Sequence, residues 1–404
     1  MQIELPLFTN LLILLVTARL LGEIFEQFKQ PSMMGEIIAG IILGPSLLGL
    51  IHRTEDISVI SELGVFLLVI IAGLEIRTED ILKSLRGKNI IISIMSFLLP
   101  IVSGFAIGWC FDKSLITTIF IGLCIAITAL PVSVRILMDL GKIDSDVGKR
   151  IISVSIFNDV LALTILGVII NVNNNSVTTV SVIAVEIGLS LAKLLAFMLI
   201  LYFSYFFIKK LTRKGNLIEI GMNNLLSILK GKESLFVLFF AFVLAFSSFT
   251  ESLGFHFIIG AFFASLLINE DVVGIDHLTN IRNTTNGLAM GFLAPIFFAA
   301  IGLEFNIYSI QHYTLLIAIL AVSFFSKIAG GYFGGRLAGL GSRESGIMGI
   351  GLNARGIMEL VIANIAYKAG LIDSEIFSIL VLMGVLTTLV TPSLLKQAFK
   401  IEKK

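Results

Sequence analysis

The feature that most limits what this chain can form is a series of apolar stretches, each about twenty residues long, that recurs along nearly its whole length. A helix of that length crosses a bilayer, and helices satisfy their own backbone hydrogen bonds in lipid. Hydrophobic residues make up 56% of the 404 residues and charged ones 14%, against roughly 25% charged in soluble domains. The sequence therefore predicts an all-α polytopic membrane protein and not an enzyme.

Thirteen such spans fit the sequence, and the charges between them set an orientation. The opening MQIELPLFTN has no basic residue, so residues 5–26 are read as a span and not as a signal peptide. Lys and Arg gather in every second loop, which predicts an outside N-terminus and an inside C-terminus. The polar stretch 209–232 is a predicted cytoplasmic linker, and no soluble domain is expected. The predicted spans are 5–26, 33–51, 57–76, 88–110, 115–139, 148–171, 178–208, 233–252, 255–269, 286–304, 311–338, 345–368 and 375–396.

The two halves of the chain resemble each other. IIAGLEIR ends the third span and FAAIGLEFN ends the tenth, and their glutamates, Glu75 and Glu304, are 304 − 75 = 229 positions apart. The offset crosses seven spans, an odd number, so the two copies must run in opposite directions through the membrane. Inverted repeats of this kind are typical of secondary transporters.

Residues 124–163 carry polar groups that a plain membrane anchor does not need. Thr128 precedes Pro131 in the fifth span, and a proline removes one backbone hydrogen bond, so a helix break is expected there. The freed carbonyls and the Thr128 hydroxyl could ligate a cation. A proline kink without any ligand role is the alternative.

The sixth span places Ser155, Asn158 and Asp159 at i, i+3 and i+4, on one helical face. An ionisable residue inside a span marks an ion or proton path by default. Three oxygen-bearing side chains in an otherwise apolar helix suit a hard monovalent cation. A structural hydrogen-bond cluster is the alternative interpretation.

Two basic residues lie deep in later spans. Lys327 is in the eleventh span, and Arg355 follows Asn353 in GLNARG, where a second helix break is expected. Each needs an anionic or carbonyl partner, and we assign Asp159 to one and Glu359 to the other. The alternatives are that Lys327 extends to the membrane surface and that Arg355 only holds helix ends through backbone carbonyls.

The remaining polar and small residues give weaker signals. Glycines spaced four apart predict close helix packing and nothing more; they are Gly40 and Gly44, and the set Gly330, Gly331, Gly334 and Gly335. Glu304, at a span end, is interpreted as a solvated cap or vestibule charge. The two cysteines and four scattered histidines suggest no redox, metal or cofactor site, and a net charge of +1 argues against nucleic acid as a partner.

Several blocks together resemble a known family. ITALPVSVRILMDLGKIDSDVGKRIISVSIFNDVLA, PSMMGEIIAGIILGPSLLG, GVFLLVIIAGLEI, PIFFAAIGLEFN and GLNARGIMELVIANI are similar, in this order, to the monovalent cation/proton antiporter superfamily, especially its second branch. The resemblance implies a single membrane domain with a scaffold that forms a homodimer and a mobile core in which the fifth and twelfth spans are broken where they cross. We place the scaffold at 1–87 and 233–310, the core at 88–171 and 311–397, and a linker at 172–232.

The resemblance also implies the roles of residues. Asp159 would bind a proton and the transported cation in turn, Thr128 and Ser155 would help to ligate that cation, and Lys327 would be the family's basic position. Asn158, where many members have a second aspartate, is associated in the family with electroneutral exchange, whereas Lys327 is the residue of electrogenic members. The regulatory nucleotide-binding domain of the potassium-efflux members is not expected here.

The function expected from the sequence is therefore exchange of Na⁺, or K⁺, for protons across the plasma membrane, with a prokaryotic inner membrane as the expected site. The partners would be monovalent cations, protons, membrane lipid and a second copy of the chain. A K⁺-efflux exchanger, an uncoupled cation channel and a non-transporting sensor on a transporter scaffold are the alternatives. Na⁺, K⁺ and Li⁺ are not distinguished, because the same oxygen ligands serve all three.

Overall fold

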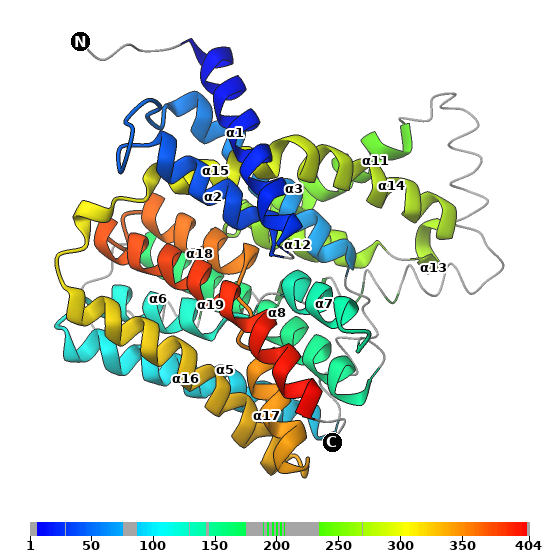
Figure 1. The fold of residues 1–404 in the computed structure, drawn as a ribbon. Helices are drawn as coiled ribbons and strands as arrows, with labels where there is room; N and C mark the ends of the chain where they lie inside the picture. Colours follow the sequence, from blue (N-terminus) through cyan, green and yellow to red (C-terminus); the bar gives the residue numbers. More distant parts are fainter. Residues whose placement is uncertain are drawn as a thin grey trace. The chain divides into compact units, whose positions relative to one another are not determined.

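The computed structural model describes residues 6–401 except positions 29, 76–86, 129, 143–144 and 269 and most of 175–233. All regular structure in these described ranges is helical (Figure 1). Eight described helices are long and apolar enough to cross a membrane, and three shorter apolar helices accompany them. The expected all-α membrane fold is thus confirmed, whereas the count of thirteen spans and their orientation stay predictions. The predicted span 178–208 and loop 209–232 lie outside the described residues, apart from isolated positions in the span.

The described helices follow one another in a fixed order along the chain. Their bounds are α1 Leu7–Gln27, α2 Ser32–Leu43, α3 Glu55–Glu75, α5 Asn89–Cys110, α6 Leu115–Ala126, α7 Leu130–Asp139, α8 Asp146–Asn174, α11 Ser234–Ser252, α12 Phe257–Leu267, α13 Glu270–Val273, α14 Ile275–Leu288, the π-helical turn η1 Ala289–Leu293, α15 Ala294–Glu304, the 3₁₀ turn η2 Ile307–Ser309, α16 Tyr313–Leu337, α17 Ser342–Gly351, α18 Ile357–Lys368 and α19 Ser374–Ile401.

Two predicted spans have different limits in the structure. α2 ends at Leu43 and not near residue 51, because Pro45 cannot continue a helix and the following turn needs Gly49 at φ +59°. The helical segment that contains the tenth predicted span begins at Ile275 and not near residue 286, since α14, η1 and α15 join into one 30-residue segment. Polar residues such as Asn283 therefore lie within a helix.

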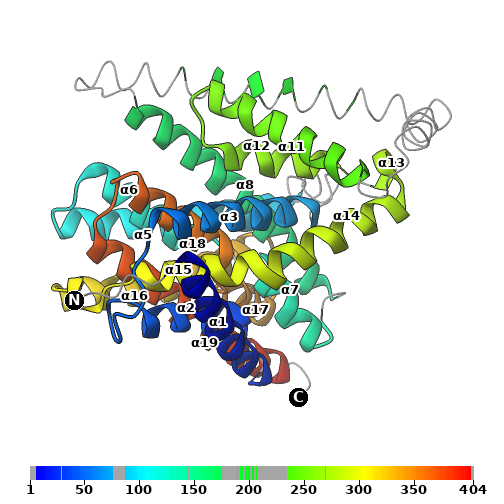
Figure 2. The same ribbon diagram turned by 90° about the horizontal axis from the view of Figure 1, so that it is seen from above.

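The chain forms two compact units. The first comprises Met1–Val65, Asp80–Ala162 and Phe292–Lys404, and the second comprises Phe66–Glu79 and Leu163–Gly291. In the second unit α11 and α12 lie side by side (Figure 2), and the ring of Phe66 packs 6.2 Å from Phe240 and 6.1 Å from Phe257 between centroids. The predicted division into scaffold and core is a separate matter and stays a prediction.

Glycines bring α2 and α15 into backbone contact in the first unit. A Cβ on Gly40 would collide with the carbonyl oxygen of Ala299, and one on Gly302 would collide with that of Ile37. The predicted close packing at Gly40 is thus confirmed. Together with α1, these helices enclose a buried cluster that includes Leu14, Ala18, Ala39, Leu43, Ile296, Ala299 and Leu303.

A second set of glycine contacts joins α5 to α6 and α16 to α17. Gly104 and Gly108 of α5 face Gly122 and Thr118 of α6, while Gly331 and Gly335 of α16 face Gly349 and Ser345 of α17. The four positions in one pair of helices correspond to the four in the other at a single constant offset along the sequence. This offset, 331 − 104 = 227 positions, differs from the 229 of the sequence comparison, and the inverted repeat stays a prediction. Figure 1 shows α5 and α16 running side by side, in agreement with their extensive contacts.

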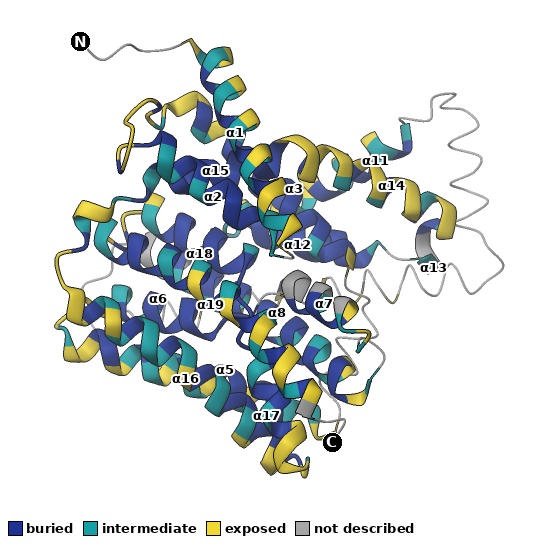
Figure 3. Cartoon of the chain, in the orientation of Figure 1, coloured by how far each residue is buried: buried dark blue, intermediate teal, exposed yellow. Residues whose placement is uncertain are grey.

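Both expected helix breaks are present. α6 ends at Ala126, Ile127 is extended at ψ 150°, and α7 starts at Leu130. Pro131 is the second residue of α7, where its missing N–H is tolerated because the first turn of a helix has no acceptor for it. α17 ends at Gly351 and α18 starts at Ile357, which leaves Asn353 and Arg355 in an unwound segment. Figure 3 shows α18 buried along most of its length.

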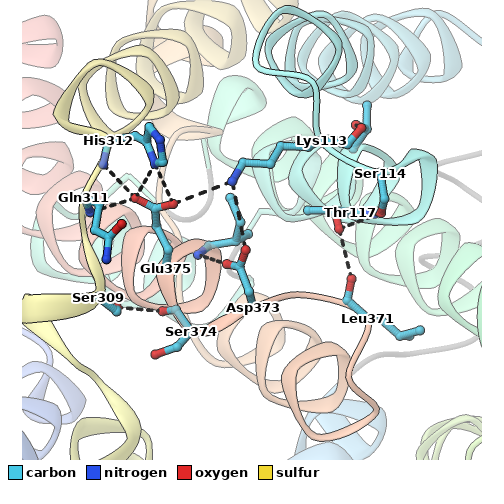
Figure 4. Close-up of polar contacts among 12 residues, drawn as sticks. Lys113, Ser114, Thr117, Ser309, Gln311, His312, Leu371, Asp373, Ser374 and Glu375 are labelled. Carbon is cyan, nitrogen blue, oxygen red and sulfur yellow. Dashed lines mark hydrogen bonds and ion pairs between the residues drawn. The ribbon is translucent and has the colours of Figure 1, made fainter.

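A polar cluster fastens three helix ends of the first unit together (Figure 4). Glu375, at the start of α19, accepts hydrogen bonds from the backbone N–H groups of Gln311 and His312, both at 2.8 Å. The Lys113 ammonium lies 3.6 Å from Glu375 and 4.0 Å from Asp373. The starts of α16 and α19 are therefore tied to the turn between α5 and α6. α6 is the helix that ends at the first break.

Candidate functional site

The predicted polar face of α8 is buried at the first helix break. Ser155 and Asn158 are 0% exposed and Asp159 is 3% exposed, and Thr128 in the break is 0% exposed. The Asn158 Nδ2 atom donates to the Thr128 hydroxyl over 3.3 Å. The structure thus brings the break and the polar face into direct contact, as the sequence suggested.

Two oxygen atoms of this group have no hydrogen-bond partner among the residues that the structure describes. They are Oδ1 of Asn158 and Oδ1 of Asp159, both buried. The Ser155 hydroxyl donates to the Ile151 carbonyl of its own helix over 2.9 Å, which leaves the lone pairs of its oxygen available. Buried polar atoms in proteins are nearly always paired, so unpaired oxygens in a protein interior call for an explanation.

Positively charged side chains donate hydrogen bonds to the carbonyls at the end of α6. Arg355 donates to the carbonyl of Cys124 over 2.6 Å and to that of Ile125 over 2.7 Å, and Lys327 donates to the carbonyl of Ala126. Positive charges at the C-terminal end of a helix are favoured by its dipole. The sequence predicted that carbonyls freed at the break could ligate the transported cation. In the structure, Arg355 and Lys327 bind these three carbonyls instead.

Lys327 does not pair directly with Asp159. Its ammonium is 0% exposed and donates to Ala126 and, over 3.2 Å, to the carbonyl of Ser96. The ion pairs found within 4.0 Å among the described residues do not join it to Asp159. The expected ion pair with Asp159 is therefore not formed among the described residues, and the alternative that Lys327 extends to the membrane surface is wrong.

Arg355 combines its two predicted roles. It holds the end of α6 through two carbonyls and reaches a third, that of Ser323 inside α16, over 3.1 Å. Its Nη1 atom also lies 3.9 Å from the Glu359 carboxylate, the partner expected from the sequence. Both residues are 0% exposed, and neither oxygen of Glu359 accepts a hydrogen bond.

α19 supports the second break. The Thr388 hydroxyl donates to the Arg355 carbonyl over 2.7 Å, and Asn353 Nδ2 donates to the Thr391 hydroxyl over 3.4 Å. The side-chain oxygen of Asn353 is buried without a hydrogen-bond partner. The unwound segment is thus held by side chains of a neighbouring helix, which is how non-helical backbone is accommodated at membrane depth.

Sequence reasoning missed Ser96 and misread Glu304. Ser96 contacts both Asn158 and Lys327, yet a serine in the apolar run ISIMSFLLP gives little signal; the glycines of α16 that pack on α5 were the available indication. Glu304 is only 11% exposed in its side chain and forms an ion pair with Arg53, so it is not a solvated cap. Its partner is far away in the sequence, which hid the pair.

Comparison with known proteins places this chain in a family. The model described as sodium/hydrogen exchanger, transmembrane, matches residues 11–401. The chain is 28% identical over 408 residues to the Na(+)/H(+)-K(+) antiporter GerN of Bacillus cereus, covering 99% of this chain and 98% of that protein. It is 27% identical over 391 residues to a Na(+)/H(+) antiporter of Enterococcus hirae, covering 96% and 97%.

A solved structure has the same fold. The sodium proton antiporter MjNhaP1 of Methanocaldococcus jannaschii, determined at pH 8, matches with a TM-score of 0.70 over 96% of each chain at 15% sequence identity. The resemblance drawn from the sequence motifs is confirmed by the family match, which covers nearly the whole chain. This multi-pass membrane protein belongs to the family of transmembrane sodium/hydrogen exchangers.

Proposed function

We propose that this protein is a secondary antiporter that exchanges a monovalent cation, Na⁺ first and K⁺ second, for protons at one shared carboxylate. Membership of the family supports cation/proton exchange, and relatives are named as Na⁺/H⁺ and K⁺/H⁺ antiporters. The observation that carries the proposal is the pair of buried oxygens, Asp159 Oδ1 and Asn158 Oδ1, that have no hydrogen-bond partner.

Unpaired oxygens fit a site that is completed by a cation. Leaving a polar oxygen buried without a partner costs free energy, and a hard cation bound by oxygen ligands removes that cost. Thr128 accepts a hydrogen bond from Asn158, and Ser155 shares the helical face of Asn158 and Asp159, so their hydroxyl oxygens are the proposed further ligands. Asn353, whose oxygen is also unpaired, belongs to the second break and is not part of this ligand set.

The position of Lys327 is compatible with an Asp159 carboxylate that binds a proton and the transported cation in turn. Among the described residues, no ion pair within 4.0 Å involves Asp159, and the Lys327 ammonium is bound by the carbonyls of Ser96 and Ala126. Asp159 is therefore free of a competing protein cation at hydrogen-bond distance. Either a proton or the transported cation can neutralise it, and each excludes the other.

Exchange follows if the site changes access only when Asp159 is neutralised. A core that moves with a bare carboxylate would carry an uncompensated charge through a low-dielectric region, which is strongly disfavoured. Movement with either occupant couples the two fluxes by alternating access. Because one proton replaces one monovalent cation at one carboxylate, the proposed exchange is electroneutral.

Asp159→Asn tests the shared carboxylate. The purified variant in proteoliposomes should lose cation-driven proton flux, because an amide neither ionises nor binds a proton. Asp112→Asn is the matched control: Asp112 is exposed at φ 51°, a backbone conformation that asparagine tolerates, and exchange should persist. Exchange that survives in folded Asp159→Asn protein contradicts the proposal.

The same vesicles test substrate and charge balance. Na⁺, K⁺ and Li⁺ gradients are applied in turn, with the membrane potential free or clamped by an ionophore for a different ion. Electroneutral exchange should proceed at the same rate in both conditions. Cation flux without proton movement would instead identify an uncoupled channel, and no flux from wild-type protein with any of the three cations would favour a non-transporting sensor.

The remaining expectations belong to the same proposal. We propose a homodimer formed through a scaffold at 1–87 and 233–310, a mobile core at 88–171 and 311–397 whose two broken helices cross, and a linker at 172–232. The orientation, N-terminus outside and C-terminus inside in a prokaryotic plasma membrane, is supported by the distribution of Lys and Arg. Single introduced cysteines are labelled with a membrane-impermeant reagent in intact cells and in inside-out vesicles, which tests the orientation.

A further inference from the structure

We propose that Ser96 is a positioning residue of the exchange site: its hydroxyl holds the Asn158 amide in the orientation that turns the amide oxygen toward the cation. This inference rests on the proposed function and names a residue outside the predicted ligand set. Ser96 is in α5 and 0% exposed, and it meets α8 and α16 at the same point.

The nitrogen and the oxygen of the Asn158 amide differ in their hydrogen bonds. Its Nδ2 atom donates to Thr128 Oγ1 over 3.3 Å and to Ser96 Oγ over 3.4 Å. An amide nitrogen has two hydrogens, so these two acceptors use its donor capacity fully. The oxygen on the other side of the amide is left buried and without a partner.

Ser96 can accept this bond because its own proton is used elsewhere. The Ser96 hydroxyl donates to the Ser93 carbonyl, one turn earlier in α5, over 3.1 Å. Its oxygen therefore faces Asn158 as an acceptor and favours the NH₂ group over the amide oxygen at that position. A flipped amide would place two oxygens together and would direct N–H groups at the cation, which repels a positive charge.

The backbone of Ser96 has a second contact, which its side chain does not share. The Ser96 carbonyl accepts from the Lys327 ammonium over 3.2 Å. Close approach of α16 makes this possible, since a Cβ on Gly330 would lie 2.8 Å from the Met95 oxygen and 3.0 Å from Ser96 Cα. Ser96→Ala removes the hydroxyl but keeps the carbonyl, so it isolates the effect on Asn158.

The first test separates cation affinity from maximal rate. In proteoliposomes, Ser96→Ala should raise the half-saturating Na⁺ concentration roughly three- to tenfold, as expected for one lost hydrogen bond, with little change in maximal rate. Ser93→Ala is the matched control, because Ser93 is equally buried in the same helix and its hydroxyl has no hydrogen-bond partner. It should leave the half-saturating concentration within about twofold of wild type, since it removes no bond.

The second test asks whether Ser96 acts through Asn158. Ser96→Ala is introduced into Asn158→Ala protein, and Na⁺-dependent thermal stabilisation in detergent is measured alongside exchange, so that weak transport does not hide binding. The Ser96 effect should disappear in this background. An equal effect in both backgrounds, or one no larger than that of Ser93→Ala, would overturn the positioning role. Either result leaves wild-type exchange intact, whereas absence of wild-type exchange would overturn the proposed function itself.

Discussion

The guanidinium of Arg355 donates to the Cys124 carbonyl over 2.6 Å, so the basic residue of the second helix break caps the helix that ends at the first. The same group reaches the carbonyls of Ile125 and Ser323. One side chain therefore joins α6, α16 and the segment before α18. Its positive charge faces the negative end of the α6 dipole, and Glu359 lies in the first turn of α18, where a negative charge is favoured.

Arg355→Lys should weaken this junction without removing its charge. A single ammonium cannot reach all three carbonyls with the spacing of a guanidinium. Each lost bond to a charged group is worth about 1.5–3 kcal/mol, so the apparent melting temperature in detergent should fall clearly and exchange should slow. A melting temperature equal to wild type would show that the carbonyl contacts contribute little.

A charge-removal pair checks the Glu359 contact. Arg355→Met removes the guanidinium that lies 3.9 Å from the buried Glu359 carboxylate. Breaking a buried ion pair by removing one partner costs about 3–5 kcal/mol. Adding Glu359→Gln should recover part of the lost stability, because no unpaired charge then remains. If the double variant melts no higher than Arg355→Met, the two side chains are not coupled.

The success of sequence analysis depended on how local each signal was. Ser155, Asn158 and Asp159 follow the helical period within five positions, and both breaks have proline or glycine nearby, so these features were predictable. The Lys327 partner was not, because it depends on how close α16 comes to α5 and α6. Arg53 and Glu304 meet only through tertiary packing, and no periodicity links them.

Glycine packing between α16 and α17 gives a comparison within one helix. A Cβ on Gly349 would collide with the Ile328 carbonyl, whereas one on Gly346 would meet nothing within 4 Å. Gly349→Ala should therefore destabilise the protein by about 1–3 kcal/mol through overpacking. Gly346→Ala should be neutral or stabilising by up to about 1 kcal/mol, because alanine favours a helix. Thermal unfolding of both variants measures this, and equal melting temperatures would contradict the tight contact.

Glu304→Gln should expose the value of the ion pair with Arg53. The Arg53 side chain is 12% exposed and also donates to Ser58 over 3.1 Å. Burial lowers the pKa of Arg53 to about 10, which still leaves it charged at neutral pH. Removing the Glu304 carboxylate leaves the Arg53 charge without its ion-pair partner. We expect the free energy of unfolding to fall by about 2 kcal/mol, less than for a fully buried pair. Chemical or thermal unfolding in detergent measures it.

The exposed pair of Arg19 and Glu23 is the control. Their atoms approach to 2.7 Å, but the Glu23 side chain is 55% exposed. Glu23→Gln should cost less than about 1 kcal/mol, and high salt should remove the effect. If Glu304→Gln is equally mild and equally sensitive to salt, the Arg53 pair behaves as a surface contact.

Competition at Asp159 gives exchange a defined pH dependence. When protons and the cation bind the same carboxylate, a tenfold rise in proton concentration should raise the half-saturating cation concentration by up to about tenfold, while saturating cation restores the maximal rate. Initial rates measured across pH and Na⁺ concentration test this. A maximal rate that falls as the pH falls, with the half-saturating concentration unchanged, would indicate a separate proton site. Glu359, buried in the first turn of α18 just after the second break, is a candidate for that site.

Asn158→Asp should change the charge balance of exchange. A second carboxylate beside Asp159 lets the site carry two protons against one Na⁺, so transport should become sensitive to the membrane potential, with an inside-negative potential driving Na⁺ out. An ionised carboxylate also cannot donate to Thr128 and Ser96, as the amide does, so cation affinity and thermal stability should fall. Asn158→Ala serves as the control, because it loses the same hydrogen bonds but adds no proton site and should remain electroneutral. Rates that stay independent of a clamped potential in Asn158→Asp protein would show that the second carboxylate does not carry a proton through the cycle.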